Sequence, residues 1–291
     1  MRRRSFVIGA ASVGPVLACG GVGDLRDLED RAKRPDGRGF TNLEGGFEGY
    51  NRLSVVYVPK GAEGGKVPLM LGMHGGNGVP ENMYAKHDLR ELCDEQGWIG
   101  LFPYMNLPDD AEDRHGDFNY VDHILRKVAR EWKADKSRIY AVGFSGGGKK
   151  AYMLAAQSSD LVSAIAVSSC RIGFRGFEEM WSPKLNKAKT VSILHIHGKK
   201  DSRIPLEGGM DAERGEVGVG MREGLELWAD NNGNKLHKGA SKPAKCPDRV
   251  KAYHWSGKRK VMGLTDPKLK HGWPSWGNDV IADFLKGAPS R

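Results

Sequence analysis

Residues 139–156 constrain the fold most, because an apolar run there meets a glycine-rich turn and then a helical pattern. The β-branched run 139–144 leads into Gly143-Phe144-Ser145-Gly146-Gly147, a G-x-S-x-G pattern, and residues 149–156 have the composition of a helix. A strand, a tight turn with serine at its tip and a helix together are typical of a nucleophile elbow. The same five residues also fit a plain glycine turn with an ordinary serine, so the elbow interpretation depends on partners elsewhere in the chain.

Apolar runs and helical patterns alternate along the whole chain. The run 67–73 is continuously apolar, as expected of a central strand that is buried on both faces. Strands are predicted at 50–59, 67–73, 98–103, 139–144, 161–167, 191–198, 250–255 and 260–264, and helices at 80–95, 120–132, 149–156, 221–230 and 280–285. This alternation predicts an α/β fold with a mostly parallel central sheet and helices on both faces, a three-layer sandwich. A length of 291 residues suits one large domain of this class.

The N-terminal segment has the features of an export signal. Arg3-Arg4-Ser5-Phe6-Val7 resembles a twin-arginine motif, and the apolar run 6–18 is too short to span a bilayer. The run ends in Val16-Leu17-Ala18-Cys19-Gly20, which resembles a lipobox with Cys19 as the acylated residue. Cleavage by an ordinary signal peptidase and a cytosolic N-terminal helix are the alternatives.

We therefore expect an export signal over residues 1–19, a flexible tether over 20–45 and a catalytic domain over 46–291. The protein is expected outside the cytoplasm, as a periplasmic, secreted or lipid-anchored protein. A membrane would be contacted only through that anchor.

The distribution of charge and the spacing of the cysteines limit the kinds of partner that the protein is expected to bind. The formal net charge is +9, but the basic residues are scattered and no basic stripe is interleaved with aromatics, which argues against nucleic acid. Beyond Cys19 the cysteines are Cys93, Cys170 and Cys246, and no C-x-x-C spacing indicates a metal site. In an oxidising compartment we expect a Cys170–Cys246 disulfide, with Cys93 as a buried thiol. No cofactor is expected.

A serine nucleophile needs a base within hydrogen-bond reach and an acid that orients the base. After a nucleophile elbow the acid follows on a later strand and the histidine comes later still. Asp201, just past the predicted strand 191–198, fits the acid at the carboxyl edge of the sheet. Glu207 and Asp211 are competitors a few residues further on.

His271 fits the base, because it lies in a loop marked by Gly272 and Pro274 before the last helix. His237 lies in a polar stretch, and His254 falls within a strand pattern that is more typical of a packed histidine.

Backbone amides must stabilise the developing oxyanion. The amide of Gly146 directly follows the serine, and a second donor is expected from the loop His74-Gly75-Gly76-Asn77 after strand 67–73. Gly76 is the predicted donor. His74 is expected to brace this loop and, with Trp273, to contribute to substrate binding.

These pieces, in this order, resemble the polyhydroxybutyrate depolymerases and feruloyl esterases of the LpqC-like and carbohydrate esterase family 1 group. The resemblance rests on four motifs over roughly residues 50–285: His74-Gly75, Gly143 to Gly147, His197-Gly198-Lys199-Lys200-Asp201 and His271-Gly272-Trp273-Pro274. Two further likenesses are Asp135 to Tyr140, before the elbow, and Trp228 to Gly233. The family often has a cysteine where this chain has Gly76, and residues 234–270 match it poorly.

The resemblance implies an α/β-hydrolase fold and a serine carboxylic-ester hydrolase with Ser145, His271 and Asp201 in the catalytic roles. The implied substrates are small or polymer-linked esters (feruloyl, acetyl or hydroxyalkanoate), so a polysaccharide or a polyester would be the partner. A serine peptidase of the prolyl-oligopeptidase type shares the same triad order. A catalytically silent, polymer-binding lipoprotein is the alternative outside the enzymes.

Overall fold

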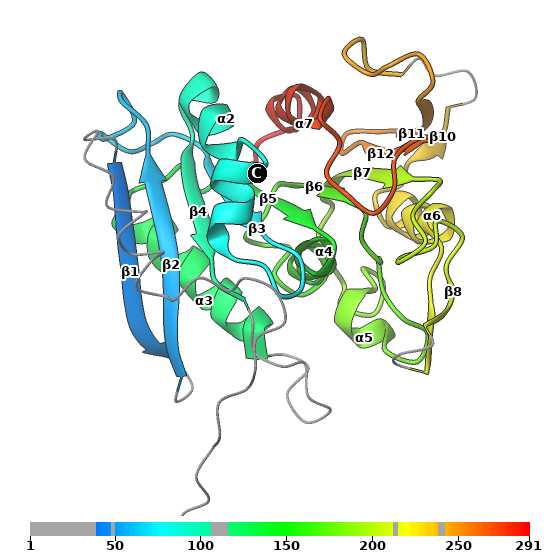
Figure 1. Cartoon of the computed structure of the whole chain (residues 1–291), viewed down its shortest axis with the longest axis horizontal. Helices are drawn as coiled ribbons and strands as arrows, with labels where there is room; N and C mark the ends of the chain where they lie inside the picture. The colour runs from blue at the N-terminus through cyan, green and yellow to red at the C-terminus, as the bar shows by residue number, and fades with distance from the viewer. Residues whose placement is uncertain (1–38, 48–49, 106–115, 212–214, 238–241) are drawn as a thin grey trace, which may run out of the picture.

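A computed structural model, shown in Figure 1, describes residues 39–47, 50–105, 116–211, 215–237 and 242–291. The predicted export signal, with Cys19 and most of the predicted tether, lies outside the described residues. Within the described ranges, no helix combines the length and the apolar character needed to cross a membrane.

Ten strands form one mixed sheet. They are β1 (Gly39–Phe47), β2 (Tyr50–Val58), β3 (Leu69–Met73), β4 (Ile99–Pro103), β5 (Ile139–Phe144), β6 (Ala164–Ser168), β7 (Ser192–Gly198), β10 (Lys235–Leu236), β11 (Lys251–Ser256) and β12 (Val261–Asp266). The order across the sheet is β1-β2-β4-β3-β5-β6-β7-β12-β11-β10. The central strands from β4 to β12 are parallel, and the flanking pairs are antiparallel. The predicted mostly parallel sheet is therefore confirmed.

Helices cover both faces of this sheet, as Figure 1 shows. They are the π-helical turn η1 (Asn82–Lys86) and the helices α2 (Leu89–Gln96), α3 (Gly116–Glu131), α4 (Gly146–Gln157), α5 (Glu178–Trp181), α6 (Met221–Asn231) and α7 (Gly277–Lys286). Side chains of β5 alternate between two apolar clusters: Ile139 and Ala141 pack with α3, α4 and α6, whereas Tyr140 and Val142 pack with α2 and α7. The result is the expected three-layer sandwich, an α/β-hydrolase fold.

Three elements differ from the sequence-based expectation. β1 pairs with β2 along its whole length, so the folded domain already includes Gly39 and the expected boundary at residue 46 is wrong. The predicted helix 80–95 is divided into η1 and α2 by Asp88, whose φ of 53° lies in the left-handed region. The glycine-rich loop after β7 contains a small separate hairpin, β8 (Gly209–Asp211) with β9 (Glu216–Gly218).

The expected Cys170–Cys246 disulfide is wrong, because both residues are free, buried thiols, as is Cys93. Cys170 packs in the apolar cluster beneath α4, and Cys246 packs in the cluster on the opposite face of the sheet. The sheet separates the two sulfurs, which rules out a bond between them without rearrangement of the core.

Candidate active site

Ser145 stands at the junction between β5 and α4, in a backbone conformation with φ 52° and ψ −117°. This region is rarely adopted by non-glycine residues, so the surrounding chain must hold it in place. A Cβ on Gly147 would lie 2.2 Å from the carbonyl oxygen of Met73, and one on Gly143 would lie 2.4 Å from that of Gly147. Both glycines are therefore required for β5, α4 and β3 to approach, as the motif predicts.

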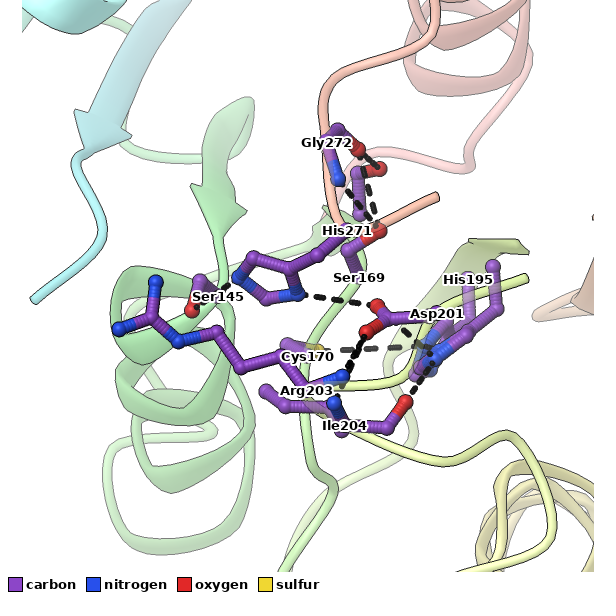
Figure 2. A network of polar contacts seen from close by, with 11 residues as sticks. Ser145, Ser169, Cys170, His195, Asp201, Arg203, Ile204, His271 and Gly272 are labelled. Carbon is purple, nitrogen blue, oxygen red and sulfur yellow. Dashed lines mark hydrogen bonds and ion pairs between the residues drawn. The ribbon is translucent and has the colours of Figure 1, made fainter. Parts of the chain in front are cut away.

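The structure brings together the three residues that the sequence singles out. His271 Nε2 lies 3.1 Å from Ser145 Oγ, and His271 Nδ1 lies 2.9 Å from Asp201 Oδ2. Figure 2 shows the imidazole between the hydroxyl and the carboxylate. The ring is placed to accept a proton from Ser145 through Nε2 while Nδ1–H donates to Asp201.

Asp201 is fully enclosed, yet its carboxylate is well supplied with donors. Oδ1 accepts hydrogen bonds from the amides of Arg203, at 3.0 Å, and Ile204, at 2.8 Å, while Oδ2 faces His271. Burial alone raises the pKa of Asp201, but the bonds from His271 and the Ile204 amide outweigh it, and the pKa lies below its usual value. Asp201 is thus held as the anion that can orient an imidazole.

A buried chain of polar groups runs beneath the acid. Tyr152 Oη lies 2.9 Å from His195 Nδ1, His195 Nε2 lies 3.1 Å from His197 Nδ1, and His197 Nε2 lies 2.9 Å from the carbonyl of Ile204. Burial lowers the pKa of both histidines, which are therefore neutral. With each group donating to the next, every polar atom in this chain has a partner, and α4 is tied to the loop that carries Asp201.

The loop that carries His271 is fixed to the end of β6. Ser168 Oγ and Ser169 Oγ both lie 3.0 Å from the carbonyl of Gly272, and the Gly272 amide donates back to Ser169 Oγ at 3.3 Å (Figure 2). Gly198 lies so close to this loop that a Cβ there would be 2.1 Å from the carbonyl of Leu269. Sequence reasoning missed these serines; their position directly after a buried strand was the available signal.

Gly76 and Gly146 line the same hollow as Ser145. A Cβ on Gly146 would lie 3.3 Å from the amide nitrogen of Gly76, so the two glycines are neighbours. Neither amide donates to a backbone carbonyl in the described part of the chain. The predicted pair of oxyanion donors is thus adjacent and available.

His74 braces the loop of Gly76 and does not line the site. Its Nδ1 lies 2.7 Å from the Gly75 carbonyl, and its Nε2 accepts the amide of Met105 at 3.0 Å. The side chain is buried, which lowers its pKa to about 4. These contacts fit the expected bracing role of His74. Its expected part in substrate binding stays a prediction, which its burial and its contacts with loop backbone do not favour.

Two hollows flank Ser145. The serine-side hollow, of about 490 Å³, is lined by Gly76, Gly146 and Ser145 and by Lys149, Arg171, Phe174, Arg203 and Asp211 among others. The histidine-side hollow, of about 680 Å³, is lined by His271, Trp273, His87 and Phe144 among others. His87 stacks on Trp273 with ring centroids 5.2 Å apart, and both rings line this hollow.

The competing acids and bases have other contacts or lie in other elements than the Ser145–His271–Asp201 group. Asp211 pairs with Arg171 at 3.2 Å, and Glu207 is exposed. His237 is exposed in the polar stretch after β10, and His254 is part of β11. Within the ranges that the structure describes, no three His, Cys, Asp or Glu side chains are grouped to hold a metal ion.

The fold and the site together define an α/β-hydrolase with a Ser-His-Asp arrangement at the carboxyl edge of its sheet. No family model matches the chain. It is similar to the bifunctional acetylxylan esterase/xylanase XynS20E of Neocallimastix patriciarum, with 27% identity over 156 residues, covering 53% of this chain and 22% of that protein. It is also similar to the probable feruloyl esterase C of Aspergillus clavatus, with 28% identity over 185 residues, covering 60% of this chain and 65% of that protein.

Among solved structures, the acetyl xylan esterase from Aspergillus awamori superposes with a TM-score of 0.60 at 15% identity, over 85% of this chain and 99% of that one. At this identity the likeness supports the fold. The curated relatives fit the feruloyl-esterase side of the resemblance drawn from the motifs, although the alignments span about a fifth and about two thirds of their lengths.

Proposed function

We propose that this protein is a serine carboxylic-ester hydrolase in which Ser145 is the nucleophile, His271 the general base and Asp201 the residue that orients the base. The observation that carries the proposal is the 3.1 Å contact between Ser145 Oγ and His271 Nε2, backed by the 2.9 Å contact between His271 Nδ1 and Asp201. The esterase relatives support the same reaction class.

In the first half of the reaction, His271 Nε2 takes the proton of Ser145 as Oγ attacks the ester carbonyl carbon. The carbonyl oxygen becomes an oxyanion that the amides of Gly146 and Gly76 stabilise. His271 then gives its proton to the departing alcohol, and the acyl group stays on Ser145. The second half repeats these steps with water, which releases the carboxylic acid and restores Ser145.

The histidine-side hollow suits the alcohol part of the ester. The departing oxygen must lie next to His271 Nε2 to receive its proton, and this hollow is the one that His271 lines. The stacked rings of Trp273 and His87 form one wall of this hollow, and burial lowers the pKa of His87 to about 4, so the wall is neutral. A sugar or phenol ring fits such a wall, in line with feruloyl or acetyl esters of a polysaccharide.

Ser145→Ala tests the assignment. The variant should lose turnover of 4-nitrophenyl acetate and butyrate and labelling by a fluorophosphonate while it keeps the wild-type circular dichroism spectrum. Full activity in the variant would end the proposal. An unlabelled wild-type protein that still retains polymer would favour the silent binding protein.

The acyl group is open among feruloyl, acetyl and hydroxyalkanoate esters, and polyester hydrolysis is part of this proposal. A panel of feruloyl, acetyl and 3-hydroxybutyrate esters, with a peptide amide beside them, separates these substrates. Faster turnover of the peptide amide than of any ester would favour the peptidase instead.

We also propose export through the twin-arginine signal, with Cys19 either lipidated or removed with the signal. Replacing Arg3 and Arg4 by lysine should leave the protein in the cytoplasm. Cys19→Ala should then separate the two fates, because only a lipidated protein changes from the membrane fraction to the soluble fraction.

A further inference from the structure

We propose that the serine-side hollow, which Ser145 lines, binds acyl groups that carry a negative charge, such as the free carboxylate of a dicarboxylic half-ester. The inference rests on the proposed esterase function of Ser145 and names the substrate class that this site would prefer. The juxtaposition behind it is a cluster of three cationic side chains around a nucleophile.

The geometry assigns the acyl group to this hollow. In the tetrahedral intermediate the oxyanion faces the amides of Gly146 and Gly76, and the departing oxygen faces His271. The remaining substituent, the acyl chain, must extend away from His271. The hollow that contains Ser145, Gly146 and Gly76 but not His271 in its lining lies in that direction.

Three cations line this hollow: Lys149, Arg171 and Arg203. Lys149 lies one helical turn after the nucleophile, since its amide donates to the Ser145 carbonyl at 3.2 Å. Arg203 follows the acid by two residues, and Figure 2 shows its side chain extending toward the Ser145 side of the site. In the described part of the chain, no ion pair is formed by the Arg203 guanidinium, which is solvent-exposed.

Arg171 gives the hollow a fixed charge. It is 7% exposed, its guanidinium lies 4.9 Å from the Phe174 ring centroid, and it pairs with Asp211 at 3.2 Å. Lys149 Nζ lies 5.5 Å from the same ring, so the two cations converge on Phe174. Among the described lining residues, three cations accompany one carboxylate, that of Asp211.

The lining also fits a short carbon chain between the ester and the anion. Phe174, Ile204 and Met210 contribute apolar atoms beside the cations. By contrast, the histidine-side hollow has one lysine, Lys86, and one aspartate, Asp88, so its charges balance. The asymmetry predicts that a negative charge favours binding on the acyl side only.

Two pairs of esters distinguish the effect of a negative charge from the effect of size. They also distinguish a charge on the acyl part of the ester from one on the alcohol part. The first pair is 4-methylumbelliferyl hemisuccinate and 4-methylumbelliferyl 4-oxopentanoate, which have acyl groups of matched length and differ in the terminal carboxylate. The second pair is 4-acetoxybenzoate and its methyl ester, which differ in charge on the alcohol side.

We expect kcat/KM to favour the hemisuccinate by about tenfold at low salt, the equivalent of one good ion pair. The preference should shrink as ionic strength rises, and the second pair should show no preference for the charged ester.

Substitutions of the lining cations test whether these side chains cause the preference for the charged ester. Lys149→Gln combined with Arg203→Gln should reduce kcat/KM for the hemisuccinate about tenfold more than kcat/KM for the 4-oxopentanoate. Arg130→Gln, which removes a cation from the exposed end of α3, should leave the preference unchanged. If the double variant does not fold, Arg203→Glu, a change at an exposed side chain, should by itself lower the preference.

The proposal is overturned if the wild type turns over both esters of the first pair equally, or if the preference survives in the variants. Equal turnover would leave the esterase function intact. Absence of any turnover, with no fluorophosphonate labelling of Ser145, would instead remove the esterase function and the inference that rests on it.

Discussion

His197 Nε2 lies 3.5 Å from Asp201 Oδ2 while it faces the Ile204 carbonyl at 2.9 Å. One neutral imidazole therefore supports the acid and also holds the loop whose amides bind the other carboxylate oxygen. His197 touches no substrate position, so it acts as a positioning residue.

The variant His197→Phe should keep the ring volume and lose these contacts. It leaves the Ile204 carbonyl without its histidine donor and leaves His195 Nε2 with only the 4.0 Å contact to Cys170 Sγ, which costs about 1–3 kcal/mol. Misplacement of Asp201 should lower kcat by roughly ten- to a hundredfold with a smaller change in KM. The matched control is His254→Phe in β11, away from the site. A folded His197→Phe variant with wild-type kcat would contradict the positioning role.

Acid should destabilise the protein between pH 6.5 and 4. Burial lowers the pKa of His74 to about 4 and lowers the pKa of His195 and His197, so the folded state stays neutral where the unfolded state gains protons. The unfolded state then binds more protons, and stability falls as pH falls, by about 1.4 kcal/mol per pH unit for each such histidine.

Urea unfolding at a series of pH values measures this slope. His74→Gln should reduce the slope of the unfolding free energy against pH by about 1.4 kcal/mol per pH unit, because it removes one of the groups that stay neutral in the folded state. An unchanged slope in His74→Gln would mean that His74 takes up its proton without unfolding.

Gly147→Ala should disrupt the elbow. The added methyl group would lie 2.2 Å from the Met73 carbonyl oxygen, and backbone on both sides resists displacement. We expect a loss of stability of at least about 3 kcal/mol, together with loss of activity. Gly64→Ala, where a methyl group meets nothing within 4 Å, should change stability by less than about 0.5 kcal/mol. Thermal melts of the two variants give the comparison, and equal melting temperatures would refute the packing argument.

Ser168, the last residue of β6, and Ser169, which follows it, provide a graded test of the His271 loop. Ser169 bonds both the carbonyl and the amide of Gly272, whereas Ser168 bonds the carbonyl only. Ser169→Ala should therefore lower kcat more than Ser168→Ala, by a few-fold for each lost bond of about 1 kcal/mol. Steady-state kinetics on one acetyl ester suffice, and the reverse order would show that loop anchoring does not limit the position of His271.

Much of the fold follows from the sequence because the central strands have continuous apolar runs and clear boundaries. Residues 67–73 and 191–198 could be placed as strands from such runs alone. β1 could not, since it is the edge strand of the sheet, paired only with β2 in the described residues, and its glycine-rich sequence lacks an alternating pattern. The predicted Cys170–Cys246 disulfide is wrong because the number of cysteines and the oxidising compartment do not indicate which face of the sheet a thiol occupies.

The residues of the site likewise divide into those that the sequence predicts and those that it does not. Ser145, Asp201 and His271 carry local motifs, so their order along the chain predicts that they meet. His195 and Arg171 carry no such signal, since a histidine or arginine within an apolar stretch looks like an ordinary packed residue. His197 belongs to the motif that ends at Asp201, but that motif does not predict its contact with His195. Their role depends on contacts between residues distant in sequence, such as Tyr152 with His195 and Arg171 with Asp211.

Ser145 and His271 are 126 positions apart in the chain, and His271 and Asp201 are 70 apart. Such contacts form only after most of the chain has found its topology, because closing long loops is entropically costly before the contacts repay it. Hydrolytic turnover is thus a reporter of complete folding. In a refolding experiment it should lag behind the recovery of helical signal, and a chain that crosses a membrane already folded would carry a finished catalyst with it.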